Sequence, residues 1–229
     1  MQNIVIGIEG LVGAGKTSIC REMLNYLPNA VLLNGGNLYR AIVYIMMKNG
    51  STISKMKKNG KNLNIRKMID LLQIEVRIEK RETVFYANGV KLSEEELQSK
   101  ETSIAVSEVS NTANNEDAFV FVHDLIEELK KQYNVIFSGR ATMKIYPECD
   151  YHFFIIADLD ERVRRKSIQY NTKANDQIRD NIIKRDELQA KSGFYDYTPT
   201  TIEVDVTECK SVEESTQKVL QKIKIKESV

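Results

Sequence analysis

The stretch Gly10-Leu11-Val12-Gly13-Ala14-Gly15-Lys16-Thr17 decides the fold of this chain. It reads Gly, four residues, then Gly-Lys-Thr, the pattern of a phosphate-binding loop between a strand and a helix. The apolar, β-branched run 4–8 precedes it and suits a buried parallel strand. Apolar residues at helical spacing follow between residues 17 and 27. The context therefore favours a phosphate loop over a glycine-rich turn that merely connects two elements.

The residue types in this loop match the chemistry of holding a phosphate. Glycines adopt backbone angles closed to other residues and let the chain come close to an anion. The turned amides and the N-terminus of the next helix attract negative charge. We expect Lys16 to place its charge on the outer phosphates and the Thr17 hydroxyl to ligate Mg²⁺, which takes oxygen donors. The pattern predicts phosphate binding but leaves the reaction open.

The composition limits the classes of protein that this chain can belong to. Its 229 residues allow one sizeable core with a small inserted subdomain. A net charge of +1 gives no global sign of nucleic acid or an anionic membrane as partner. No apolar run approaches the roughly 20 residues of a membrane span, and the chain enters a strand at once, so we expect no signal peptide. Three distant cysteines fit reduced thiols. These features predict a cytoplasmic protein.

The segment after the first helix offers a second candidate contact for an anion. Residues 30–33 predict a core strand, residues 34–37 a turn, and residues 38–46 a buried helix. Arg40 falls in the first turn of that helix, where the helix dipole does not favour a cation. We therefore prefer an anion contact over a merely solvated charge.

Between about residues 50 and 103 the character of the chain changes. Residues 75–79 and 83–87 alternate like strands, and Asn88-Gly89 is a hairpin signal. Ser93 and three glutamates predict a capped helix. The region 50–103 is predicted to be a small antiparallel sheet with helices, inserted into a larger α/β domain. Helices are then predicted at 107–113 and 118–133.

Two further core strands bring more arginines towards the loop. The strand 134–137 ends in Ser138-Gly139-Arg140, and ligands bind at the carboxyl ends of parallel strands. Arg140 should therefore lie near the phosphate loop. A basic helix opens at residues 160–166, after the strand 151–156. It is either a solvated face or part of an arginine-bearing lid, which we assign with its adjoining helix to residues 158–198. A strand at 201–206 and a helix at 211–225 complete the domain.

The ordered series of motifs resembles the bacterial type of cytidylate kinases (CMP kinases) over nearly the whole chain. The matching segments are Glu9–Thr17, Gly36–Ala41, the hairpin Asn88-Gly89, Val109–Ala113, Gly139-Arg140, Glu161–Arg165 and Arg185-Asp186. The resemblance implies an α/β fold with a P-loop NTPase-type parallel sheet flanked by helices, in a single domain 1–229. The inserted subdomain would bind the nucleoside monophosphate. It also implies a monomer whose partners are small-molecule nucleotides, with no nucleic acid and no membrane.

The departures from the family pattern lie on the acceptor side. Gly35 stands where the family has Ser or Thr, and Ala141 where it has Asp after Gly-Arg. Gln189 and Ser192 stand where the family has Asp and Arg that hold the cytosine and its phosphate. Asn114 takes the place of a serine in the base-binding region. Because hydrogen bonds in a site discriminate strongly, these changes predict weakened or altered base choice.

The resemblance implies ATP-dependent phosphoryl transfer to CMP or dCMP, with Mg²⁺. The implied ATP-binding residues are Gly10, Leu11, Val12, Gly13, Ala14, Gly15, Lys16, Thr17 and Ser18. The implied catalytic residues are Lys16, Arg140, Arg162, Arg165 and Arg185. The implied acceptor residues are Gly36, Tyr39, Arg40, Asn114, Arg140 and Arg185. Thr17 would ligate the metal, and Glu9 would take a metal-bound water.

Two alternatives stay open from the sequence alone. The replaced acceptor residues are compatible with a kinase of a different small acceptor, which a panel of substrates would distinguish. A non-catalytic nucleotide-binding regulator is the other alternative, against which the retained lid arginines argue, since binding alone does not need all of them.

Overall fold

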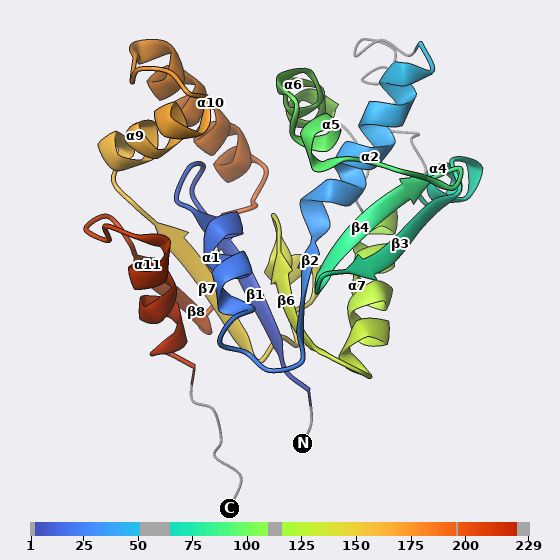
Figure 1. The fold of residues 1–229 in the computed structure, drawn as a ribbon, viewed down its shortest axis with the longest axis horizontal. Coiled ribbons are helices and arrows are strands. Elements are labelled where there is room, and N and C mark those ends of the chain that lie inside the picture. Colours follow the sequence, from blue (N-terminus) through green and yellow to red (C-terminus); the bar gives the residue numbers. More distant parts are fainter. Residues whose placement is uncertain (1–2, 51–64, 110–115, 196, 224–229) are drawn as a thin grey trace, which may run out of the picture. The chain divides into compact units, whose positions relative to one another are not determined.

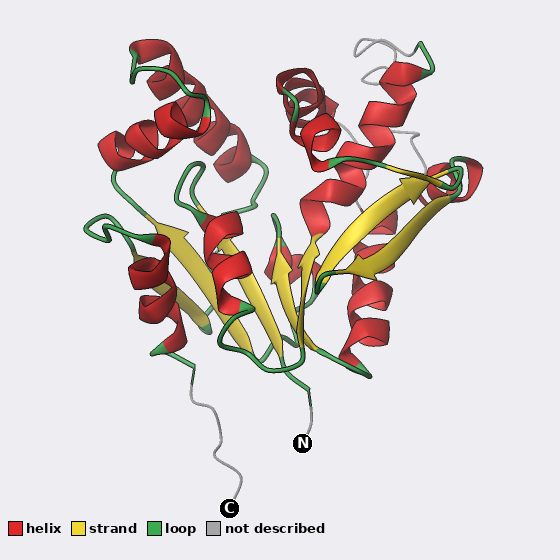
Figure 2. Ribbon diagram, viewed as in Figure 1, coloured by secondary structure: helices red, strands yellow, loops and turns green. Residues whose placement is uncertain are grey.

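The computed structural model describes residues 3–50, 65–109, 116–195 and 197–223. Two compact units are present: the chain up to Leu32 together with the chain from Tyr133 onward, and the segment Leu33–Gln132. Figure 1 follows the chain through both units by colour, and Figure 2 separates helices from strands. Within the described ranges, no helix is both long enough and apolar enough to cross a membrane.

The first unit is built on a parallel sheet. Its strands are β1 (Val5–Gly10), β2 (Ala30–Asn34, of which residues 30–32 belong to this unit), β6 (Asn134–Ser138), β7 (Tyr151–Ile156) and β8 (Thr201–Asp205). The strand order is β2-β6-β1-β7-β8. β1 pairs in parallel with β6 and β7, and β7 with β8. Since Ile8 is paired with Ser138, the segments that follow β1 and β6 leave the sheet at the same edge.

Helices flank this sheet, and two of them pack against its strands to form the apolar core. They are α1 (Lys16–Met23), α8 (Thr142–Ile145), α9 (Leu159–Gln169), α10 (Asp176–Lys191) and α11 (Val212–Leu220). α1 and α11 pack together on one face of the sheet, as Figure 1 shows, and share one apolar cluster with the strands. All six residues of β1 are buried, as expected for a central parallel strand. Each fully buried aliphatic side chain contributes about 1.5–3 kcal/mol to this core.

The second unit combines an antiparallel sheet with helices. Its elements are α2 (Gly35–Lys48), α4 (Ile65–Leu71), β3 (Ile74–Glu79), β4 (Glu82–Ala87), β5 (Val90–Lys91), α5 (Glu94–Gln98), α6 (Lys100–Val109) and α7 (Glu116–Lys130). β4 pairs antiparallel with β3 and with β5. Asn88 and Gly89 have φ of 49° and 75°, the left-handed values of a type I′ hairpin turn. The hairpin predicted from Asn-Gly is confirmed.

Helix boundaries in the second unit follow from their caps. The Ser93 hydroxyl accepts a hydrogen bond from Glu96 N at 3.1 Å, and the Glu96 carboxylate accepts one from Ser93 N at 3.0 Å. This capping box begins α5 and confirms the predicted role of the serine. α2 and α6 pack through Val43, Ala105 and Val106.

Two local predictions were wrong, and one helix was missed. The predicted turn 34–37 is the end of β2 and the first turn of α2. The helix expected to begin at residue 107 begins earlier, at Lys100, since the Ser99 hydroxyl accepts a hydrogen bond from Thr102 N at 3.2 Å. The rest of that prediction, residues 110–113, lies outside the described part. α8 was not predicted, because four residues are too few to show a period. The predicted α/β class, with a parallel sheet flanked by helices, is confirmed.

Candidate active site

The phosphate loop leaves the carboxyl end of β1 and enters α1. Gly10, Gly13 and Gly15 have φ of 144°, 83° and 99°, in the region that favours glycine. A Cβ atom on Gly10 would lie 2.1 Å from the Ile155 carbonyl oxygen, so no side chain fits there. Gly15 is the N-cap residue of α1. The loop therefore leads directly to a helix N-terminus, which is the geometry of an anion site.

Lys16 lies in the first turn of α1, with its ammonium turned back onto the loop. Its Nζ donates hydrogen bonds to the carbonyl oxygens of Gly10 and Leu11, both at 2.7 Å. Burial lowers the pKa of Lys16 to about 7, Asp186 opposes this shift, and nearby cations add to it. Those cations are Arg140, Arg185 and Lys166. An anion placed among them would restore the charge of the lysine.

Arg140 and Arg185 are brought together beside Lys16, as the sequence predicted for Arg140. Burial, followed by the charge of Arg185, lowers the pKa of Arg140 to about 10. The Nε atom of Arg185 is buried without a hydrogen-bond partner in the described part of the protein. Neither guanidinium forms an ion pair there, in contrast to Arg162, Arg164, Arg165 and Arg179. Two neighbouring unpaired cations next to a phosphate loop are suited to bind a further anion.

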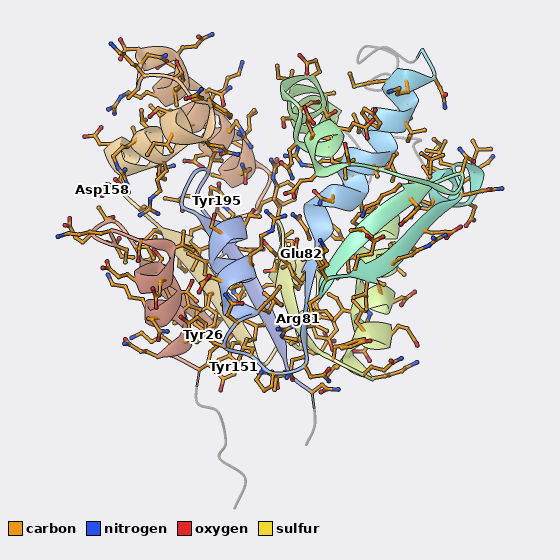
Figure 3. The ribbon with its side chains drawn as sticks, in the orientation of Figure 1. Tyr26, Arg81, Glu82, Tyr151, Asp158 and Tyr195 are labelled. Atoms are coloured by element: carbon orange, nitrogen blue, oxygen red, sulfur yellow. The ribbon has the colours of Figure 1, made fainter. Side chains whose placement is uncertain are left out.

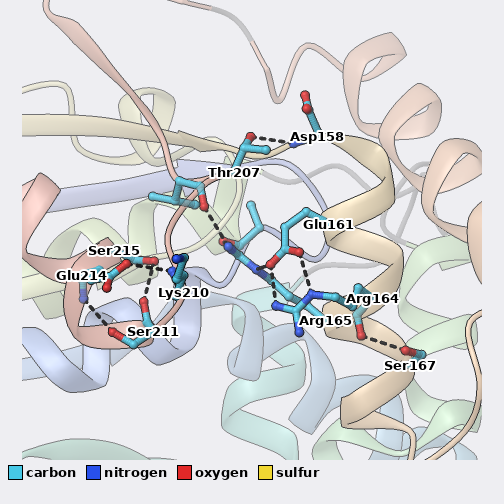
Figure 4. A network of polar contacts seen from close by, with 12 residues as sticks. Asp158, Glu161, Arg164, Arg165, Ser167, Thr207, Lys210, Ser211, Glu214 and Ser215 are labelled. Carbon is cyan, nitrogen blue, oxygen red and sulfur yellow. Dashed lines mark hydrogen bonds and ion pairs between the residues drawn. The ribbon is translucent and has the colours of Figure 1, made fainter.

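Arg165 contacts the backbone of the loop instead of projecting into solvent. Its Nη1 donates to Ala14 O at 2.9 Å, and its Nη2 donates to Val206 O at 2.7 Å. Its Nε pairs with Glu161 at 2.7 Å, and Figure 4 shows the same carboxylate holding Arg164. Arg165 thus links α9, the loop and the end of β8.

Arg162, one turn earlier on α9, is buried against the same loop. Its Nη1 donates to Val12 O at 3.2 Å and forms an ion pair with Asp186 of α10. Both arginines predicted for the lid therefore hold loop carbonyls in this structure. The side chain of Arg164, at 56% exposure, pairs with Glu161, and the Arg164 carbonyl accepts a hydrogen bond from the Ser167 hydroxyl.

The two residues predicted to serve a metal occupy different surroundings. Thr17 and the exposed Ser18 are in the first turn of α1, beside the loop. Glu9 is buried at 3% exposure. Its Oε1 accepts a hydrogen bond from Thr142 N, and its Oε2 lies 3.4 Å from Nε2 of His152. The structure therefore gives the Glu9 carboxylate contacts inside the core.

The remaining predicted acceptor residues belong to the second unit. Gly36, Tyr39 and Arg40 are all in α2. Arg40 Nη1 donates to Leu97 O at 2.8 Å and to the Ser103 hydroxyl at 2.9 Å. Burial raises the pKa of Tyr39. Asn114 lies outside the described residues.

Asp186 and Tyr195 are site residues to which the sequence assigned no role. Asp186 Oδ1 accepts hydrogen bonds from Val12 N at 3.0 Å and from the Tyr195 hydroxyl at 2.8 Å. Figure 3 labels this tyrosine, which is in the loop after α10. The sequence could have identified Asp186 as a site residue, because it directly follows Arg185 on a helix already assigned to the site. No sequence pattern indicated a site role for Tyr195.

Comparisons with known proteins identify the family of this chain. The family model of cytidylate kinase matches residues 6–225. A cytidylate kinase of Clostridioides difficile (strain 630) is 29% identical, with 98% of this chain and 100% of that protein covered. One from Caldicellulosiruptor bescii is 26% identical, with coverages of 97% and 95%. One from Halalkalibacterium halodurans is 25% identical, with coverages of 98% and 99%. The match runs through the phosphate loop, the arginines after β6 and on α9, and the Arg-Asp pair of α10, so the resemblance seen in the sequence is confirmed: the chain belongs to the cytidylate kinase family.

Proposed function

We propose that this protein transfers the γ-phosphoryl group of ATP to the 5′-phosphate of CMP or dCMP. The observation that carries the proposal is the cluster of Lys16, Arg140 and Arg185, in which neither arginine has an ion-pair partner among the described residues. Phosphoryl transfer needs positioning and charge neutralisation more than a strong base. Membership of the cytidylate kinase family supports a cytidine nucleotide as the acceptor.

The donor phosphates are held by the loop. The amides of residues 13–17 form the anion cradle at the N-terminus of α1. Lys16 exchanges its two carbonyl acceptors for phosphate oxygens, which return a counter-charge to a buried ammonium. Arg140 and Arg185 hold the acceptor phosphate and the transferring group, because a planar guanidinium binds phosphate through two parallel hydrogen bonds.

The acceptor and lid assignments remain proposals. The segment 50–103, together with Gly36, Tyr39, Arg40 and Asn114, is proposed to bind the nucleoside monophosphate. The segment 158–198 is proposed to act as the lid, with Arg162 and Arg165 supporting the loop carbonyls. We further propose a monomeric, cytoplasmic enzyme that binds neither membranes nor nucleic acid.

The residues of the loop fit a magnesium ion bound together with ATP. Mg²⁺, when bound, neutralises charge between the β- and γ-phosphates. Thr17 can supply a hydroxyl oxygen from the first turn of α1, beside the amide cradle. The role expected for Glu9, holding a metal-bound water, remains a prediction, since its carboxylate contacts Thr142 and His152 in the core.

The first experiment measures ADP release from ATP and Mg²⁺ with CMP, dCMP, UMP and AMP in parallel. Turnover with CMP or dCMP alone is the expected result. It would mean that cytosine is recognised although Gln189 and Ser192 replace the family's Asp and Arg. ATP binding without turnover on any of the four acceptors would contradict the proposed acceptor and favour another small molecule.

The loop lysine provides the matched test of mechanism. Lys16→Ala should abolish nearly all transfer while the circular dichroism spectrum stays unchanged, because its ammonium donates hydrogen bonds to two backbone carbonyls of the loop, those of Gly10 and Leu11. Near-normal turnover in this variant would overturn the proposed role of the loop.

A further inference from the structure

One ion pair holds both the backbone N–H and the backbone carbonyl of Val12 in the phosphate loop. Val12 N donates to Asp186 Oδ1 at 3.0 Å, and Val12 O accepts from Arg162 Nη1 at 3.2 Å. Arg162 and Asp186 are also paired with each other. The arginine is on α9 and the aspartate on α10, so two successive helices both hold a loop residue that lies far from them in the sequence.

The carboxylate of Asp186 is fully used within the protein. Oδ1 accepts from Val12 N and from the Tyr195 hydroxyl, while Oδ2 faces the guanidinium of Arg162. The side chains of the ion pair are only 9% and 17% exposed. A buried ion pair is a weak source of stability, because desolvation offsets the attraction, and a better attested use is to specify one arrangement.

The same three segments also share an apolar cluster. Val12 packs with Val163 of α9 and with Ile178 and Ile182 of α10. Arg185 is the residue before Asp186 on α10, and its Nε is buried without a hydrogen-bond partner among the described residues. Holding Asp186 at Val12 therefore also fixes the turn of α10 that carries Arg185.

We propose that Asp186 is a positioning residue that, paired with Arg162, sets the phosphate loop at Val12 and keeps Arg185 beside it. This inference rests on the proposed function for its kinetic consequences, but its effect on ATP binding does not depend on the acceptor. Asp186 touches neither reacting group. Its loss acts through the position of the loop and of Arg185.

The test compares Asp186→Asn with Asp160→Asn. Asp160 is a matched control, since it forms an ion pair with Arg179 that also joins α9 to α10, but at 83% and 39% exposure and away from the loop. Asp186→Asn should lower kcat by about 100-fold, the scale of a small misplacement of reacting groups. Asp160→Asn should stay within about twofold of the wild type, as expected for an exposed ion pair.

ATP affinity separates this inference from the proposed function. The chain has no tryptophan, so a fluorescent ATP analogue serves as the probe. Asp186→Asn should bind it about tenfold more weakly than the wild type, because the loop that holds the phosphates is displaced. Failure of the wild type to phosphorylate any cytidine nucleotide would overturn the proposed function and leave this binding test intact.

A second variant covers the case in which Asp186→Asn does not fold. Arg162→Lys keeps the charge but shortens the reach to Val12 O, and it should weaken binding of the ATP analogue in the same direction. Analogue affinity equal to that of the wild type in a folded Asp186→Asn protein, or in Arg162→Lys if the first is unfolded, would overturn the positioning role.

Discussion

His152 Nε2 lies 3.4 Å from Oε2 of Glu9, and the two side chains are only 1% and 3% exposed. The other Glu9 oxygen accepts a hydrogen bond from Thr142 N, the first residue of α8. The carboxylate thus joins the end of β1, just before the phosphate loop, to the segment that follows Arg140.

We predict that Glu9→Ala destabilises the protein by about 1–3 kcal/mol, because it leaves the buried backbone amide of Thr142 without its acceptor. Urea unfolding followed by circular dichroism measures the change. Glu187→Ala, which removes an exposed carboxylate on α10, is the control and should change stability by no more than about 0.5 kcal/mol. Equal stabilities of the two variants would contradict the structural role of Glu9.

A methyl group at Gly10 should be far more costly than one at Gly89. Both glycines have positive φ, of 144° and 75°, so both substitutions introduce backbone strain. A Cβ at Gly10 meets the Ile155 carbonyl at 2.1 Å, whereas one at Gly89 meets nothing within 4 Å. We expect Gly89→Ala to cost about 1 kcal/mol and Gly10→Ala at least about 3 kcal/mol. Thermal unfolding of both variants checks the difference, and similar losses would refute the steric explanation.

The sequence predicts the framework of the site well, because its signals are local. The spacing of the glycines, Lys16 and Thr17 identifies the loop, and the rule for parallel strands places Arg140 at the same edge of the sheet. The hairpin at Asn88-Gly89 and the cap at Ser93 likewise depend on near neighbours in the chain.

The contacts that complete the site could not be predicted in this way. Asp186 meets Val12 across 174 positions of the sequence, and its pairing with Arg162 depends on how α9 and α10 pack. The two lid arginines, Arg162 and Arg165, were expected to contact phosphates, and in this structure they donate to loop carbonyls. The sequence could not predict these carbonyl contacts, because a run of cations does not show which acceptors will lie near it.

ATP binding should weaken with increasing pH above about 7. Lys16 must be protonated to pair with a phosphate, its pKa in the free protein is about 7, and bound phosphates raise that pKa. Below this pH the lysine is charged in both states and binding takes up no proton. Above it, binding takes up one proton and affinity falls by up to about tenfold per pH unit, until the pKa of the complex is passed.

Calorimetric titration in two buffers of different ionisation enthalpy measures this proton uptake at pH 6 and at pH 8.5. Lys16→Arg is the control, because arginine stays charged throughout and contributes no uptake. Proton uptake at pH 8.5 that is the same in both proteins would show that the titrating group lies elsewhere, for example on the nucleotide.

The unpaired cations lead to a prediction in which stability and activity change in opposite directions. Arg185→Met removes a buried, unpartnered guanidinium nitrogen and relieves the repulsion that lowers the pKa of Arg140. We expect the ligand-free variant to be about 1 kcal/mol more stable, or about 2–4 °C higher in Tm, while transfer activity falls at least about 100-fold. Differential scanning fluorimetry and the ADP-release assay measure the two effects.

Arg179→Met on the same helix is the control, because it removes an arginine that has an ion-pair partner. Arg179 is paired with Asp160, so losing it removes an attraction instead of a repulsion and should leave Tm unchanged or slightly lower. Inorganic phosphate should raise the Tm of the wild type and of Arg179→Met but not that of Arg185→Met, since only the last variant lacks part of the anion site. A fall in Tm for ligand-free Arg185→Met would mean that the guanidinium stabilises the fold. That result would contradict the claim that the unpaired cations lower the stability of the ligand-free protein.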